Sequence, residues 1–85
     1  MDIRYKPSFV REFKKLPKAV QDEALQKIAL FRDATNHEQL KVHKLKGKLK
    51  DFYSFSVTYL HRIVFMYEKK DVVVFLAVGD HDIYR

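Results

Sequence analysis

A run of seven apolar residues at positions 72–78, followed by Gly79, is the feature that most constrains how this chain can fold. Val dominates the run, and β-branched side chains favour strands. Because the run has no polar position that could face water, we expect an interior β-strand covered on both faces. It is far shorter than the ~20 residues that cross a bilayer. With no secretory pattern before Pro7, we expect a soluble, cytoplasmic protein.

Two segments before this run alternate with the two-residue period of a strand. In residues 53–57, aromatic and aliphatic side chains alternate with Ser54 and Ser56, and residues 62–67 alternate in the same way with Arg62 at their start. A charged hairpin loop leads from there into the apolar run. We therefore expect three consecutive antiparallel strands, with the two serines and Arg62 together on one face.

The N-terminal part of the chain has helical spacing. Residues 2–5 are expected to form a short edge strand, after which a helix opens at Ser8 and is interrupted by Pro17. A second, longer helix, its apolar stripe widened by Leu25, ends near Asn36. The order β-α-α-β-β-β predicts an α+β fold with both helices packed on one face of an antiparallel sheet. The opposite face is left for a ligand.

Length and charge set further bounds. Eighty-five residues allow one domain, residues 1–85, and without Cys its core must come from packing alone. Seventeen Lys and Arg against eleven Asp and Glu give a formal net charge of +6, which suits a polyanionic partner such as nucleic acid or an acidic protein. Residues 41–50 hold five of the lysines and His43 with no acid. The positive potential therefore belongs to this basic segment, unless it is only a solvated loop.

Five short motifs follow one another along the chain: Pro7-Ser8-Phe9, His43-Lys44-Leu45-Lys46-Gly47, Tyr53-Ser54-Phe55, His61-Arg62-Ile63-Val64-Phe65 and Val78-Gly79-Asp80-His81-Asp82-Ile83-Tyr84-Arg85. In this order they strongly resemble the RelE/ParE toxin superfamily, particularly its RelE, YoeB and YafQ-like messenger-RNA interferases. The resemblance covers the whole chain. It implies a RelE-like fold and the toxin of a type II toxin–antitoxin system, a ribosome-dependent endoribonuclease that cleaves messenger RNA and inhibits translation. It also implies a cognate antitoxin that holds the toxin in a hetero-oligomer.

Metal-free RNA cleavage needs a base for the 2′-hydroxyl proton, a cation for the charge that develops on the phosphate, and an acid for the leaving 5′-oxygen. The resemblance implies that His43 is the base, that Arg62 holds the scissile phosphate and that His81 is the acid, while Tyr84 orients or stacks the substrate. Histidine suits both proton roles near neutral pH, and which histidine plays which role stays open. Each residue also has a structural alternative. His43 would then be an exposed loop imidazole, His81 a turn residue, and Arg62 a snorkelling side chain or half of an ion pair.

The same resemblance implies that seven further residues bind RNA and the ribosome. Lysine at four positions of the basic segment supplies attraction to phosphate that is independent of sequence. Two serines stand where RelE has lysines, so the histidine scheme of the YoeB and YafQ-like branches is the better model. These seven residues are Lys44, Lys46, Lys48, Lys50, Ser54, Ser56 and Arg85.

Four His without Cys, and without the spacing of zinc ligands, argue against a metal site, and no cofactor or membrane partner is expected. The leading alternative function is a ParE-like inhibitor of DNA gyrase, which needs no catalytic residues. The sequence of such an inhibitor would predict the same helices and strands. A third possible function is a binding module for an acidic protein, in which the positive charge only raises the rate of association. The set of His43, Arg62, His81 and Tyr84 favours the nuclease.

Overall fold

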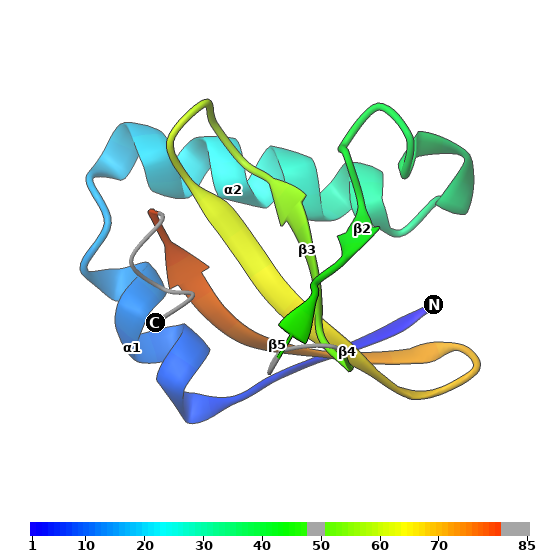
Figure 1. The fold of residues 1–85 in the computed structure, drawn as a ribbon. Helices are drawn as coiled ribbons and strands as arrows, with labels where there is room; N and C mark the ends of the chain where they lie inside the picture. Colours follow the sequence, from blue (N-terminus) through cyan, green and yellow to red (C-terminus); the bar gives the residue numbers. More distant parts are fainter. Residues whose placement is uncertain (48–50, 81–85) are drawn as a thin grey trace.

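The computed structural model describes residues 1–47 and 51–80 of the chain, and its elements follow the expected order (Figure 1). Both α-helices precede the antiparallel strands of the C-terminal half. The elements are β1 (Asp2–Tyr5), α1 (Pro7–Lys14), α2 (Lys18–Phe31), the short 3-10 helix η1 (Ala34–Asn36), β2 (His43–Lys44), β3 (Tyr53–Ser56), β4 (Arg62–Lys69) and β5 (Val72–Gly79).

The strands form one sheet in the order β1-β5-β4-β3-β2. The expected antiparallel pairings of β3 with β4 and of β4 with β5 are confirmed. Two details go beyond the prediction: β1 pairs with β5 in parallel, which makes the sheet mixed, and the two residues of β2 add an antiparallel edge strand. The apolar run forms β5, which lies inside the sheet between β1 and β4. Its second face is only partly covered, because Val74 and Ala77 are half-buried.

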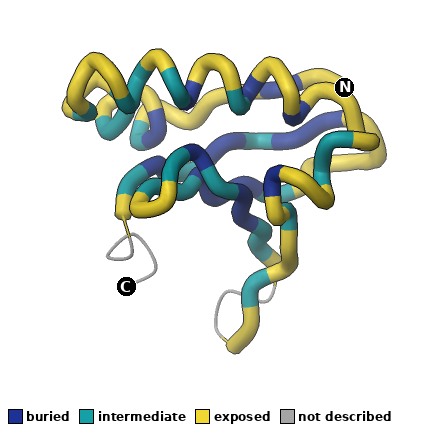
Figure 2. Tube along the Cα trace, turned by 90° about the horizontal axis from the view of Figure 1, so that it is seen from above, coloured by how far each residue is buried: buried dark blue, intermediate teal, exposed yellow. Residues whose placement is uncertain are grey.

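Both helices pack on one face of the sheet, as predicted, and the buried positions gather between the two layers (Figure 2). Phe31 at the end of α2 is fully buried, and its ring centroid lies 4.6 Å from that of Phe55, 4.9 Å from that of Phe65 and 5.6 Å from that of Phe75. Aromatic rings at these separations add attraction beyond the area they bury. Leu25 does not join this core, because 57% of its surface is exposed.

The second helix ends earlier than the sequence pattern predicts, at Phe31 rather than near Asn36. Asp33 has an extended backbone and its side chain accepts hydrogen bonds from N and Oγ1 of Thr35, which starts a separate turn of 3-10 helix. These bonds, from the Thr35 hydroxyl first and its backbone N–H second, lower the pKa of Asp33. Asn36 then donates from Nδ2 to the carbonyl of Leu30 and so satisfies the end of α2.

Side chains of α1 complete the hydrogen bonding of β5 where β1 stops. The register of β1 against β5 ends at Tyr5 and Phe75, so the following residues of β5 have no strand on that side. Ser8 Oγ donates to the carbonyl of Leu76 at 2.8 Å. The N–H of Val78 donates to Oε1 of Glu12 at 3.1 Å. These contacts attach α1 to the C-terminal end of β5, where Gly79 pairs with Arg62.

None of the helices in the described part of the chain has the length and apolar character needed to cross a membrane.

Candidate functional site

Arg62 lies on the sheet face that the helices leave uncovered. It begins β4, and the register pairs it with Ser56 on one side and Gly79 on the other. Because directly paired residues point to the same face, the predicted grouping of Ser56 with Arg62 is confirmed. Nη1 of Arg62 donates a 2.9 Å hydrogen bond to Oγ of Ser56. The guanidinium is therefore held in place from the neighbouring strand.

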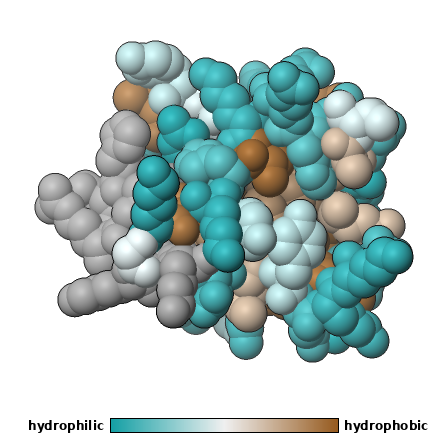
Figure 3. Space-filling model, turned by 45° about the vertical axis from the view of Figure 1, so that its right-hand side comes forward, coloured by the Kyte–Doolittle hydropathy of each residue, from teal (hydrophilic) through white to brown (hydrophobic). Residues whose placement is uncertain are grey.

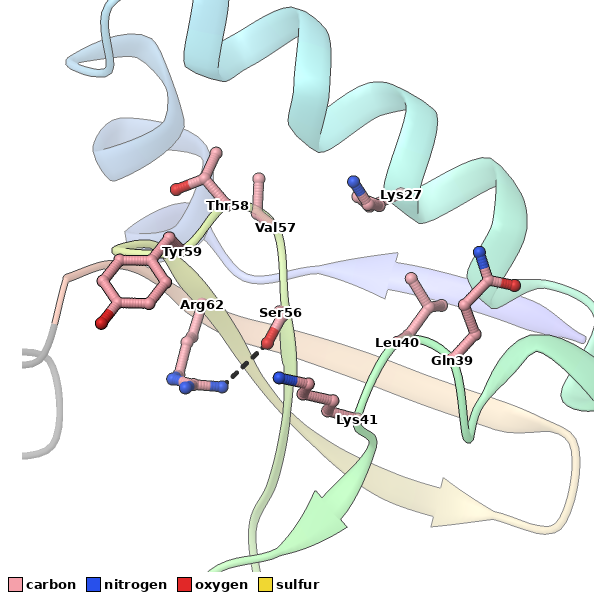
Figure 4. A pocket seen from close by; sticks show the side chains of 9 residues that line it. All are labelled: Lys27, Gln39, Leu40, Lys41, Ser56, Val57, Thr58, Tyr59 and Arg62. Carbon is pink, nitrogen blue, oxygen red and sulfur yellow. Dashed lines mark hydrogen bonds between the residues drawn. The ribbon is translucent and has the colours of Figure 1, made fainter.

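A hollow of about 450 Å³ opens beside this pair, between β3, the β3–β4 turn, α2 and the segment before β2 (Figure 4). Leu40 and Val57, both buried, form its apolar part. Among the described residues, three cations and no carboxylate line the hollow, and Figure 4 shows Lys41 and Arg62 directed toward the same part of it. The lining residues are Lys27, Gln39, Leu40, Lys41, Ser56, Val57, Thr58, Tyr59 and Arg62.

Two of the three cations have no carboxylate partner among the described residues. Nζ of Lys27 lies 2.7 Å from Oε2 of Glu23, so its charge is compensated within α2. Neither Lys41 nor Arg62 forms an ion pair with any residue that the structure describes. Within the described residues Arg62 is therefore not half of an ion pair, which was one of its two structural alternatives. The local positive potential favours an anion.

His43 lies on the edge strand β2, exposed, opposite Ser54 in the register. It shares a face with Arg62 but is separated from it by β3, about 10 Å across the strands and about 7 Å along them. Its Nδ1 lies 2.8 Å from the carbonyl oxygen of Lys41. Because a carbonyl only accepts, Nδ1 is the donor, and in the neutral ring Nε2 is the nitrogen that can take a proton.

The backbone of Lys41 has φ 61°, which is uncommon for a residue other than Gly. This left-handed residue lies between the turn after η1 and the start of β2, so its backbone angle sets the direction of the edge strand. The same angle orients the Lys41 carbonyl that accepts the hydrogen bond from His43. The neighbouring Lys44 and Lys46 are exposed. Lys48 and Lys50 lie outside the described residues.

The remaining predicted residues divide into two groups. His81, Tyr84 and Arg85 lie outside the described residues, whose last strand ends at Gly79, the partner of Arg62. Ser54 shares the face of Ser56 but is completely buried, so solvent does not reach it in this structure. Its contact with RNA stays a prediction.

The other two histidines have contacts of a structural kind. His37 stacks on Phe31 at 4.6 Å between ring centroids, and its Nε2 lies 2.8 Å from the carbonyl oxygen of Phe31. His61 lies in the β3–β4 turn with Nδ1 2.8 Å from Oγ1 of Thr58. Neither belongs to the predicted catalytic set of His43, Arg62, His81 and Tyr84.

Seven of the nine residues that line the hollow were not predicted as site residues, and the four of them with charged, amide or aromatic side chains are Lys27, Gln39, Lys41 and Tyr59. Three of these four lie far from Arg62 along the chain, and only the packing of α2 and the segment before β2 brings them near. Tyr59 carried a usable signal, because a large aromatic side chain in a short turn between two strands has little core to join.

Comparison with known proteins supports the fold and assigns the family. The sequence profile of the family described as "ParE toxin of type II toxin-antitoxin system, parDE" matches residues 3–83. Among curated proteins, none matches this sequence.

Several solved structures share the fold over nearly their whole length. A conserved hypothetical protein from Helicobacter pylori is 24% identical with a TM-score of 0.73, covering 96% of this chain and 96% of that chain. A chain of the YoeB–YefM complex from Staphylococcus aureus is 19% identical with a TM-score of 0.74, covering 95% and 97%. YafQ from E. coli is 17% identical with a TM-score of 0.73, covering 98% and 96%. At these identities the likeness shows the fold alone.

Proposed function

The chain belongs to the ParE toxin family of type II toxin–antitoxin systems, and we propose that it is a single-domain, ribosome-dependent endoribonuclease that cleaves messenger RNA. One observation carries the proposal beyond the family. Arg62, held by Ser56 and without an ion-pair partner among the described residues, borders a hollow lined by cations. A planar guanidinium fixed in this way suits two oxygens of a phosphate.

The proposed reaction is attack of the 2′-hydroxyl oxygen on the adjacent phosphorus. His43 takes the hydroxyl proton at Nε2, since Nδ1 is engaged with the carbonyl of Lys41. Arg62 stabilises the extra negative charge on the phosphate oxygens. The bond from phosphorus to the 5′-oxygen breaks, and His81 donates the proton that this oxygen needs. The products are a 2′,3′-cyclic phosphate and a free 5′-hydroxyl, so the reaction consumes no water.

The separation of His43 from Arg62 agrees with a substrate that spans the sheet face. The 2′-hydroxyl and the leaving 5′-oxygen lie on opposite sides of the reacting phosphorus, so the base and the acid must approach from two directions. Tyr84 is assigned to orienting the substrate. A face this small cannot by itself hold an RNA strand in line for attack, which is why we assign part of the positioning to the ribosome.

Binding to ribosomal RNA and the message is assigned to the basic segment. Lys44 and Lys46 are exposed next to His43, and exposed lysines bind phosphates without regard to sequence. Ser54, Ser56, Lys48, Lys50 and Arg85 complete the proposed RNA-binding set.

An antitoxin partner is part of the proposal. The family is defined by toxin–antitoxin systems, and one solved structure of the same fold is a YoeB–YefM complex. A cognate antitoxin would hold this chain in a hetero-oligomer and cover the charged face, which blocks both RNA and ribosome.

Inhibition of DNA gyrase is the second candidate function, and the family profile favours it, because the profile that matches is that of ParE. In that case His43 and Arg62 would have no chemical role.

A bacterial translation extract separates the two. The chain is synthesised in the extract, and messenger-RNA ends are mapped by primer extension, while supercoiling by purified gyrase is followed in parallel. We expect new ends in register with codons and unchanged supercoiling, with cleavage lost in Arg62→Ala and His43→Ala. Lys70→Gln is the matched control, because it removes one exposed charge at the hairpin turn, at the other end of β4. Intact messages with blocked supercoiling would overturn the nuclease proposal.

A further inference from the structure

Tyr59 is the most exposed large hydrophobic side chain among the described residues, with 93% of its surface accessible. A ring so exposed contributes little to the core, and its neighbour Leu60 is also more than half exposed. In Figure 4 the ring stands at the rim of the hollow, on the side of Arg62 and across from Lys27 and Gln39. A flat aromatic surface is therefore presented next to a fixed cation.

The turn that carries Tyr59 is closed by several hydrogen bonds. The N–H groups of Val57 and Thr58 both donate to the carbonyl of His61, at 2.9 and 3.2 Å. Oγ1 of Thr58 accepts from the N–H groups of Leu60 and His61, at 3.1 and 3.0 Å. Since the oxygen accepts from both, its own hydrogen points to Nδ1 of His61, 2.8 Å away. The backbone under Tyr59 is thus ordered before any ligand arrives, which lowers the entropic cost of binding.

The charge and size of the hollow define the ligand class. Lys41 and Arg62 offer two positive charges that no described carboxylate compensates, while Lys27 is paired with Glu23. Two nearby cations and an aromatic ring are the combination that binds single-stranded nucleic acid, the cations at the backbone and the ring at a base. The volume of about 450 Å³ lies within the range of about 300–1,000 Å³ typical of small-molecule sites.

An apolar partner fits the hollow less well than RNA does. The space-filling view, which shows one side, is mainly hydrophilic, with small apolar areas separated by polar side chains (Figure 3). A protein partner that docks by burying apolar surface needs a continuous patch. The hollow itself has only Leu40 and Val57 as buried apolar lining.

We propose that this hollow is a subsite for one nucleotide of single-stranded RNA, in which Tyr59 stacks on the base and Lys41 binds a backbone phosphate next to the one held by Arg62. This rests on the proposed function only in taking RNA as the substrate. The subsite adjoins the basic segment, because Lys41, the first residue of that segment, lines the hollow together with Arg62. It therefore extends the proposed RNA path across the end of β3 toward α2.

Stacking is tested by direct binding, without the ribosome and without cleavage. A short single-stranded RNA with a 2′-O-methyl group at every sugar cannot be cut, and its affinity is measured by fluorescence anisotropy at low salt. Tyr59→Ala is expected to weaken binding by between about fivefold and about 100-fold, the range measured for loss of one stacked base. Tyr59→Phe, which keeps the ring, is expected to stay within about twofold of the unmodified protein. Tyr59→Leu, apolar but without a ring to stack, should behave like Tyr59→Ala.

The ligand is tested in the same assay. RNA with abasic sites should bind the unmodified protein and Tyr59→Ala equally, because there is no base to stack. Lys41→Gln should make the salt dependence shallower by about one phosphate contact and leave the effect of Tyr59→Ala unchanged. Equal affinity of Tyr59→Ala and the unmodified protein for intact RNA would overturn the subsite. So would an equal loss with abasic RNA, which would indicate a structural role of the turn.

This test separates the subsite from the proposed function. If the chain binds RNA through Tyr59 but cleaves no message in the translation extract, the subsite stands and the nuclease proposal fails. If messages are cleaved and Tyr59→Ala cleaves them normally at limiting concentration, the nuclease proposal stands and the subsite fails. Loss of antitoxin binding in Tyr59→Ala with unchanged RNA affinity would assign the ring to a protein interface and overturn the inference.

Discussion

Arg62 and Ser56, direct partners across β4 and β3, are joined by a 2.9 Å hydrogen bond from the guanidinium Nη1 to the hydroxyl Oγ. A guanidinium has five N–H donors, and this bond uses one of them. It limits the rotation of a side chain that is otherwise long and mobile. In the proposed enzyme, Ser56 thus positions the group that binds phosphate without contacting the reacting atoms.

Replacing Ser56 tests this arrangement. Ser56→Ala removes a hydrogen bond worth about 1 kcal/mol, so we expect single-turnover cleavage at saturating ribosome to fall about fivefold with the fold intact. Ser56→Thr keeps the hydroxyl and should lose less. A loss in Ser56→Ala as large as in Arg62→Ala would mean that the serine acts on the reacting phosphate itself rather than through Arg62.

Arg62→Lys keeps the charge but loses the planar fork. We expect cleavage to be clearly impaired, nearer to Arg62→Ala than to the unmodified protein, because a lysine cannot bind two phosphate oxygens in parallel. Thermal melting should change by no more than a few degrees, since Arg62 has no ion-pair partner among the described residues. Parallel losses of melting temperature and activity in both variants would assign Arg62 to stability instead.

His43→Gln should abolish the acidic limb of the pH–rate profile. A general base must be unprotonated to accept a proton, so cleavage by the unmodified protein is expected to fall as the solution becomes more acidic. In the variant the rate should drop by about 10²–10⁴ and lose that dependence on pH. The measurement is single-turnover cleavage between pH 5 and 8, with ribosome integrity followed at each pH. A variant that retains the limb would transfer the base role to another group.

Glu12 is expected to stabilise the end of β5. Glu12→Ala leaves the N–H of Val78 without its acceptor, at a cost of about 1–2 kcal/mol, which lowers the melting temperature by roughly 5–15 °C in a domain of this size. Glu12→Gln keeps an acceptor oxygen and should recover most of the loss. If both variants melt alike, the charge of Glu12 matters rather than its bond to Val78.

Asp33 should make the free energy of unfolding depend on pH. Its pKa is lowered in the folded protein by the bonds from Thr35, so its contribution is complete above the ordinary carboxyl pKa and is lost as pH falls through the lower folded value. Asp33→Asn retains the cap but cannot titrate. Urea unfolding at pH 7 and at about pH 2.5 should show the unmodified protein losing more stability than the variant. A difference between the two proteins that is the same at both pH values would contradict this assignment.

The sequence by itself determined the layers of this fold and one side of the candidate site. The period of two in residues 53–57 and 62–67 determined that Ser56 and Arg62 share a face, because side chains alternate along any strand regardless of what surrounds it. The apolar run likewise required an interior strand. The end of α2 was misjudged because Asp33 breaks the helix with a side-chain bond to Thr35, a local contact that an apolar pattern does not reveal.

Only the tertiary structure decided what meets Arg62. Periodicity assigns a face but not a neighbour, so the approach of Lys41 and Tyr59 to one hollow depended on how α2 and the segment before β2 pack over the end of β3. The carbonyl that fixes the ring of His43 depended on a single left-handed residue, Lys41, whose backbone angle has no signature in the sequence. Side-chain chemistry is local and can be read along the chain, whereas a binding site is made by distant segments whose positions are set by the packing of the core.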